Sequence, residues 1–231
     1  MSEKSTTLKY SDTDYFPDPN QIAHGPEFAV SAPIVGRMYE VTTFDDEYDT
    51  KWAVKTLRPE IANSTYYPHM SMEDVFDSHI DDHQRYQEFV GEFVSPSQFY
   101  KEIDTDGNEY YVKVDRFICA GLQYKEALKN NRQMPVEQLP PLSQRLDFVK
   151  GIAQLMNSFG NPPRIPDLDF FIETKENGTG IVLFDTGYFY PEKNEGKDRR
   201  NFSHSLSKFL FTSEEMKDEE VLEAVHLLYG N

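Results

Sequence analysis

The first half of the chain has the apolar pattern of a small sheet with one helix inserted into it. Four short segments rich in valine and aromatic residues are typical of strands, and acidic or Gly-containing turns separate neighbouring members. The predicted strands are Ile34–Thr43, Lys51–Leu57, Phe99–Tyr100 and Glu109–Ile118. Between them, over Met72–Val90, apolar residues recur every three to five positions. This spacing predicts a helix with one buried face.

Helical periodicity dominates the second half. Leu142–Phe159 has the clearest apolar stripe, and Ser143 is expected to cap its start. Gln123–Asn130 is expected to form a short helix, and Phe202–Gly230 two further helical pieces. A hairpin is predicted among these helices. Its strands are Asp169–Glu173 and Gly180–Phe184.

This order of elements predicts an α+β protein with two lobes. Residues 1–27 are polar and without periodicity, so they are expected to form a flexible leader, or an arm that lies over the domain. Residues 28–118 form the predicted N-lobe, and residues 119–231 a smaller, mainly helical C-lobe. A linker is expected near Asp115–Gly121.

Composition excludes several classes of protein. The 231 residues include 40 acidic and 23 basic side chains, so the formal net charge of −17 would repel nucleic acids and anionic membranes. The single cysteine, Cys119, excludes an internal disulfide and a cysteine-rich zinc site. The first fourteen residues are polar, and no apolar run approaches the length of a membrane span. We therefore expect a cytoplasmic protein.

Candidate chemistry lies at the ends of the predicted strands. Lys55 follows the apolar residues of its strand, where an ammonium needs either an anionic partner or a path to water. Asp185 follows another apolar strand and precedes Thr186-Gly187, an arrangement that suits either a divalent cation or a simple turn. Asp167 and Asp169 are expected in a loop where that hairpin begins. Because Asp167 to Asp185 spans the hairpin, these two carboxylates are expected to converge at one end of it, as a metal site or a proton acceptor.

Together these segments resemble the protein-kinase-like fold over roughly Phe28–Gly187. Pro166-Asp167-Leu168 is similar to the catalytic loops of aminoglycoside-phosphotransferase-like proteins. The resemblance implies an antiparallel N-lobe sheet with one helix, a reduced helical C-lobe, and ATP and Mg²⁺ as cofactors. It also implies that Lys55 binds the nucleotide phosphates, that Asp185 holds the metal and that Asp167 accepts the substrate's proton.

The resemblance implies roles for further residues. Asp169 would take the place of a second metal ligand, and Asp82, or otherwise Glu88, would orient Lys55. Gly36 would lie in the loop that covers the phosphates. The residues expected beside the adenine are Val54, Asp115 and Phe117.

The resulting hypothesis is an ATP- and Mg²⁺-dependent phosphotransferase that acts on a hydroxyl group. The alternative is a catalytically inactive pseudokinase-type module that binds a nucleotide or a protein partner. Two departures favour this alternative: Ile172 stands where the family has a metal-binding Asn, and only Gly36 remains of the glycine-rich loop. A third reading is an acidic decoy or inhibitor. The basic segment Lys197–Arg200 is expected either as a surface loop or as a contact for a phosphate or an acidic partner.

Overall fold

The computed structural model describes residues 5–12, 34–35, 39–45, 51–62, 67–116, 122–130, 135–159, 165–175, 178–189 and 199–230. The fold is α+β, with antiparallel sheets and several helices, as the apolar pattern predicts. The chain forms two compact units. The first comprises Met1–Asp81 and Ser95–Ile118, and the second comprises Asp82–Val94 and Cys119–Asn231. Within the described ranges, no helix is both long and apolar enough to cross a membrane.

The first unit contains a six-stranded antiparallel sheet, with the strands in the order β1-β5-β6-β4-β3-β2. Its strands are β1 (Ser5–Ser11), β2 (Ile34–Val35), β3 (Tyr39–Asp45), β4 (Lys51–Leu57), β5 (Ser97–Ile103) and β6 (Glu109–Arg116). The one-turn 3-10 helix Pro59–Ile61 follows β4. The strands expected from the sequence are therefore present, although the predicted first strand is divided into β2 and β3.

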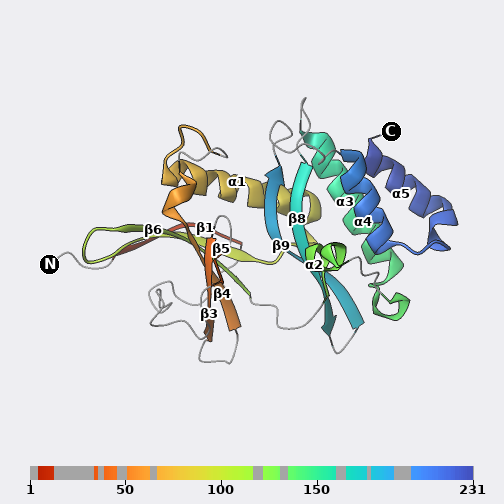
Figure 1. The fold of residues 1–231 in the computed structure, drawn as a ribbon, viewed down its shortest axis with the longest axis horizontal. Helices are drawn as coiled ribbons and strands as arrows, with labels where there is room; N and C mark the ends of the chain where they lie inside the picture. Colours follow the sequence, from red (N-terminus) through yellow and green to blue (C-terminus); the bar gives the residue numbers. More distant parts are fainter. Residues whose placement is uncertain are drawn as a thin grey trace. The chain divides into compact units, whose positions relative to one another are not determined.

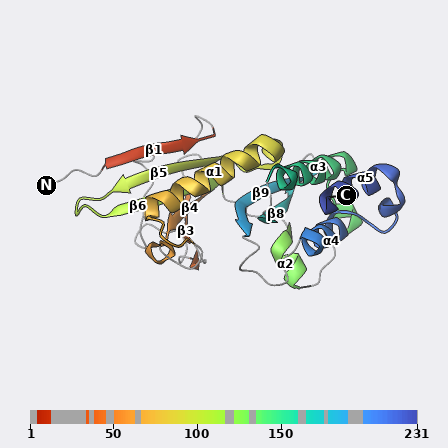
Figure 2. The same ribbon diagram turned by 90° about the horizontal axis from the view of Figure 1, so that it is seen from above.

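Helix α1 (Met72–Val90) lies between β4 and β5 in the chain and has the bounds predicted from its periodicity. Ser71 and Asp74 cap its start reciprocally: the Asp74 amide donates to Ser71 Oγ at 3.1 Å, and the Ser71 amide donates to Asp74 Oδ2 at 3.0 Å. Figure 2 shows the first half of α1 running beside the sheet. There Phe76 is completely buried against Phe99 and Tyr111, with ring centroids 5.7 and 5.4 Å apart.

Strand β1 corrects the prediction of a flexible leader for residues 5–11. It pairs antiparallel with β5 at the edge of the sheet. Two side chains attach it to the unit: the Tyr10 ring lies 6.0 Å from the Phe99 ring, and Lys9 Nζ lies 2.6 Å from Glu73 Oε1 of α1. A polar edge strand lacks the apolar alternation of a buried strand, because most of its residues keep contact with water. Periodicity therefore gave no signal for it.

The second unit combines helices with a three-stranded antiparallel sheet, β7-β8-β9. Its elements are β7 (Leu122–Gln123), α2 (Tyr124–Lys129), α3 (Leu142–Ser158), β8 (Ile165–Lys175), β9 (Gly178–Phe189), α4 (Arg199–Leu210) and α5 (Glu219–Tyr229), with one-turn 3-10 helices at Gly91–Phe93, Val136–Gln138 and Glu215–Lys217. Helices α3, α4 and α5 lie together (Figure 1), and their apolar faces form one core with the sheet. At its centre Phe170 stacks on Tyr124 at 4.7 Å and meets the edge of Phe148 at 5.2 Å.

The start of α3 differs from the prediction. Pro141, rather than Ser143, is the residue that precedes the first helical position, and it accepts a hydrogen bond from the Arg145 amide at 3.2 Å. The proline ring locks its φ angle and leaves its backbone extended, with ψ at 142°. The helix therefore starts at Leu142, and Ser143 falls inside its first turn instead of capping it.

Candidate functional site

Lys55 lies in a buried charged cluster on the sheet of the first unit. The register sets Lys55 of β4 directly opposite Lys113 of β6, and Ala53 opposite Asp115. Lys55 Nζ lies 2.5 Å from Asp115 Oδ2, and Lys113 Nζ lies 3.3 Å from Asp115 Oδ1. Ser97 of β5 also donates its hydroxyl to Asp115 Oδ1. One carboxylate thus binds two ammonium groups that would otherwise repel each other across the strands.

The electrostatics of this cluster keep Asp115 ionised. Its side chain is only 1% exposed, and burial by itself would raise the pKa of a carboxyl group. The ammonium groups of Lys113 and Lys55, together with hydrogen bonds from Lys55 and Ser97, outweigh this effect and lower the pKa of Asp115 to about 2. Asp115 is therefore a carboxylate at neutral pH.

Strand geometry separates two residues that the sequence analysis grouped in one site. Successive residues of a strand point to opposite faces of the sheet, so Val54 cannot share a face with Lys55. Val54 packs instead in a separate apolar cluster with Trp52, Tyr100, Val112 and Val114. Ala53 is the β4 neighbour that shares the face of Lys55.

Asp115 was expected where the predicted strand Glu109–Ile118 meets the linker, with its backbone groups in contact with adenine. It lies in β6, and its side chain is an ionic partner of Lys55. Lys113 and Ser97 were missed by the sequence analysis. Lys113 had a recognisable signal, because it stands two positions before Asp115 in a predicted strand and so shares its face. Ser97 had none, since only pairing between β5 and β6 brings it to Asp115.

The other predicted residues have different locations. Asp82, which was expected to orient Lys55, is half-buried on the part of α1 that belongs to the second unit. Glu88, the alternative for this role, is exposed on the same helix. Gly36 and Phe117 lie outside the described residues.

The aspartates of the second unit lie in paired strands. Asp169 of β8 is directly opposite Asp185 of β9, and Asp167 is opposite Gly187. The loop expected to carry Asp167 and the turn expected at Asp185-Thr186-Gly187 are therefore both wrong, because the two strands continue to pair through these positions. The side chains of Asp167 and Asp185 lie outside the described part of the chain, so the structure assigns these residues a register and no contacts.

Asp169 has a structural role that its sequence position did not indicate. Its carboxylate is 3% exposed and accepts hydrogen bonds from Gln123 Nε2 at 2.6 Å and from the Lys125 amide at 3.1 Å. The second bond satisfies one of the free amides in the first turn of α2. With burial, the same carboxylate raises the pKa of Tyr124. Asp169 therefore anchors α2 to the hairpin.

The described side chains do not on their own form a site for Mg²⁺. No group of three or more His, Cys, Asp or Glu residues placed to hold a metal ion occurs among them. The only predicted metal ligand with a described side chain, Asp169, already accepts two hydrogen bonds.

Comparisons with known proteins give little further information. No protein-family model matches the chain, and no curated protein matches it. Among solved structures, one match is the crystal structure of the Mycobacterium tuberculosis PknI kinase domain. The match has 15% sequence identity and a TM-score of 0.37, and it covers 76% of this chain and 70% of the PknI chain. A similarity this low carries no argument about function.

Proposed function

We propose that this protein is a kinase-like module that binds a nucleotide through its phosphates, with Lys55 as a phosphate ligand. The observation that carries the proposal is the ion pair between Lys55 and Asp115. The Lys55 side chain keeps 15% of its surface exposed, whereas that of Asp115 keeps 1%. An anion that approaches the pair therefore meets the lysine before the carboxylate. In kinase-like proteins an acid orients the strand lysine onto the phosphates, and here Asp115 would supply that acid.

Two features of the second unit favour binding over phosphate transfer. Asp167, the proposed proton acceptor, lies in a paired strand rather than in a loop. Asp169, the proposed second metal ligand, is buried and hydrogen-bonded to α2 and its flanking residue. Phosphate transfer depends on a positioned proton acceptor and on metal ions that neutralise the developing charge. The burial and hydrogen bonding of Asp169 therefore favour the pseudokinase-type alternative.

The ATP- and Mg²⁺-dependent phosphotransferase is the second candidate. It is favoured by the register of β8 and β9, which sets the two proposed metal ligands, Asp169 and Asp185, at directly opposite positions. This candidate predicts Mg²⁺-dependent consumption of ATP with a hydroxyl acceptor, and loss of that activity in Asp185→Asn.

Calorimetric titration of the full chain with ATP and with ADP, each with and without Mg²⁺, tests the proposal. Lys55→Met removes a charge-assisted contact worth about 1.5 to 3 kcal/mol, so the Kd is expected to rise by about 10- to 100-fold. Lys113→Met is the matched control. It removes the other ammonium group from the same carboxylate, so both variants disturb Asp115, whereas only Lys55→Met removes the phosphate ligand.

The outcomes distinguish the candidates. Absence of ATP and ADP binding to the wild-type protein would overturn both. An equal loss of affinity in the two lysine variants would also refute the role of Lys55, because it would show that only the integrity of the cluster matters. Binding without turnover supports the module, and turnover that is lost in Asp185→Asn supports the enzyme.

A further inference from the structure

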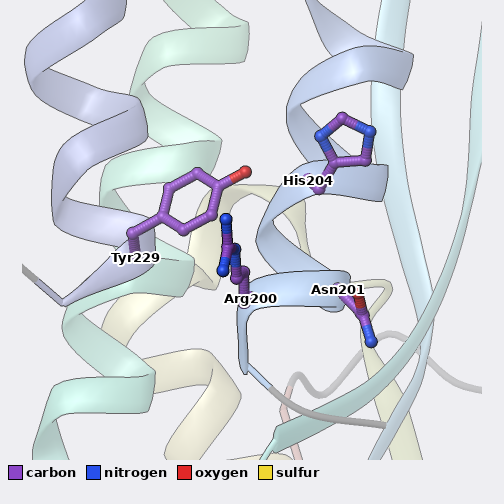
Figure 3. Close-up of a pocket in the computed structure, with 4 residues that line it drawn as sticks. All are labelled: Arg200, Asn201, His204 and Tyr229. Carbon is purple, nitrogen blue, oxygen red and sulfur yellow. The ribbon is translucent and has the colours of Figure 1, made fainter. Parts of the chain in front are cut away.

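The second unit contains a pocket that the proposed function does not use. The first turns of α4 and the last turn of α5 enclose about 550 Å³ there (Figure 3). Among the described residues, it is lined by Arg200, Asn201 and His204 of α4 and by Tyr229 of α5. All four carry a hydrogen-bonding group, and the volume lies within the range of small-molecule sites. The pocket therefore suits a small polar ligand.

Hydrogen bonds from residues outside the lining hold this pocket in shape. Arg199 Nε donates to the Leu228 carbonyl at 2.6 Å, and Arg199 Nη2 donates to the Leu227 carbonyl at 2.8 Å. Ser203 Oγ donates to the same Leu228 carbonyl at 3.0 Å. These bonds satisfy carbonyls at the end of α5 that the helix cannot satisfy itself, and they attach α4 to that end. The relative position of the lining residues is thus set before any ligand binds.

The neighbouring arginine, Arg200, has a different environment. Its side chain is exposed, and none of the described residues forms a hydrogen bond or an ion pair with it. Figure 3 shows its guanidinium group beside the Tyr229 ring, with His204 further along α4. Residues four positions apart share one face of a helix, so Arg200 and His204 border the same space. Among the described residues, none therefore competes with a ligand for this guanidinium group.

The charge of α4 selects the kind of ligand. Helix α4 contains Arg199, Arg200 and Lys208 and no acidic residue, within a chain whose net charge is −17. The acidic residues of α5 lie in its first half, at Glu219, Glu220 and Glu223, whereas the pocket adjoins its last turn. A local positive region in a negative protein concentrates anions at that point.

We propose that this pocket binds a phosphate group, either as inorganic phosphate or as the phosphate monoester of a small molecule. The planar guanidinium fork of Arg200 matches two phosphate oxygens with two parallel hydrogen bonds. His204 and Tyr229 supply a ring N–H and a hydroxyl as further donors. The site is separate from Lys55 and does not depend on nucleotide binding by the first unit.

Amide chemical-shift titration of the full chain tests this proposal. The probes are inorganic phosphate and ribose 5-phosphate, with ribose as the control that lacks the phosphate. Arg200→Gln is expected to raise the Kd by at least about tenfold, because it removes the charged fork. Lys208→Gln is the matched control: it removes the same charge from another exposed position of α4 outside the lining, and its Kd is expected to change by less than about twofold.

Shifts of residues in α4 and in the last turn of α5 with phosphate, absent with ribose, support the site. Tighter binding of ribose 5-phosphate identifies a monoester as the preferred form, and equal binding identifies the phosphate group alone. Absence of shifts with both phosphates would overturn the proposal, as would equal weakening by the two substitutions. Retained ribose 5-phosphate binding in Lys55→Met would show that this site is independent of the proposed nucleotide site.

Discussion

Asp115→Asn tests the charged cluster of the first unit most directly. The substitution keeps the size of the side chain and removes the negative charge that pairs with both Lys55 and Lys113. These two lysines are directly opposite in the register of β4 and β6, so their ammonium groups would then repel each other in a place with little access to water. We expect a large loss of stability and no change in the strand order.

The size of the stability loss follows from two considerations. The pKa of Asp115 is lowered from 3.8 to about 2, which corresponds to about 2 kcal/mol of stabilisation at pH 7. Loss of one member of a buried ion pair costs about 3 to 5 kcal/mol, because the remaining charge stays buried without its partner. The unfolding free energy is therefore expected to fall by about 2 to 5 kcal/mol. Since the folded pKa is the lower one, the wild-type contribution is present above pH 3.8 and is lost as the pH falls towards 2.

Urea unfolding monitored by tryptophan fluorescence measures this loss of unfolding free energy in the first unit, which contains Asp115. Trp52 is the only tryptophan of the chain, lies in β4 and is 5% exposed, so its emission reports the unfolding of this sheet. Asp106→Asn is the matched control, because Asp106 is exposed in a turn of the same unit, and its effect is expected to stay within about 0.5 kcal/mol.

A second variant distinguishes repulsion from a simple loss of contacts. Adding Lys113→Met to Asp115→Asn removes one of the two opposed charges, so part of the lost stability is expected to return. An Asp115→Asn protein as stable as wild type at pH 7 would refute the reasoning, because it would show that the carboxylate does not offset the lysine charges.

Two further predictions concern the second unit. Glu215→Gln is expected to cost about 3 kcal/mol at pH 7, because paired hydrogen bonds from Arg145 at 2.7 and 2.9 Å lower the pKa of Glu215 from 4.5 to about 2. In urea unfolding, the wild-type free energy of unfolding should lose this contribution as the pH falls from about 4.5 towards 2, whereas that of the variant should not. Parallel plots of unfolding free energy against pH for the two proteins would contradict the stabilising role of Glu215. Gly151→Ala is expected to lower the Tm through a loss of about 1 to 3 kcal/mol, because the new Cβ would lie 2.4 Å from Val90 Cγ1. The control Gly180→Ala places its Cβ no closer than 3.9 Å to the nearest atom, so an equal loss of Tm there would contradict close packing as the cause.

Local patterns identified the regular elements well. The bounds of α1 agree with the periodicity of Met72–Val90, and α3 differs from its predicted range by one residue at the end. A helix is built from hydrogen bonds between residues four apart, so its extent is encoded in a short stretch of sequence. The α+β class followed from the same patterns, since strands gather in the first half of the chain and helices dominate the second.

The contacts within the candidate site could not be predicted from local sequence patterns. The sequence indicated Lys55 as a lysine that needs an anionic partner, and it named Asp115 for another reason. Only the register of β4 and β6 joined the two, and the alternation of side chains along β4 then removed Val54 from the site. Register depends on which distant segments pair, which the composition of a single strand does not specify.

The hairpin of the second unit likewise depends on strand pairing that the local sequence did not predict. The sequence placed Asp167 in a loop and Asp185 before a turn, because aspartate and glycine are common in both. In the structure these residues lie in strands that pair with each other, since a partner strand satisfies their backbone groups. By itself, the sequence determined the acidic charge, the main helices and the residues able to carry chemistry. The tertiary structure alone decided which of those residues meet, because contacts between distant segments depend on strand pairing and on helix packing.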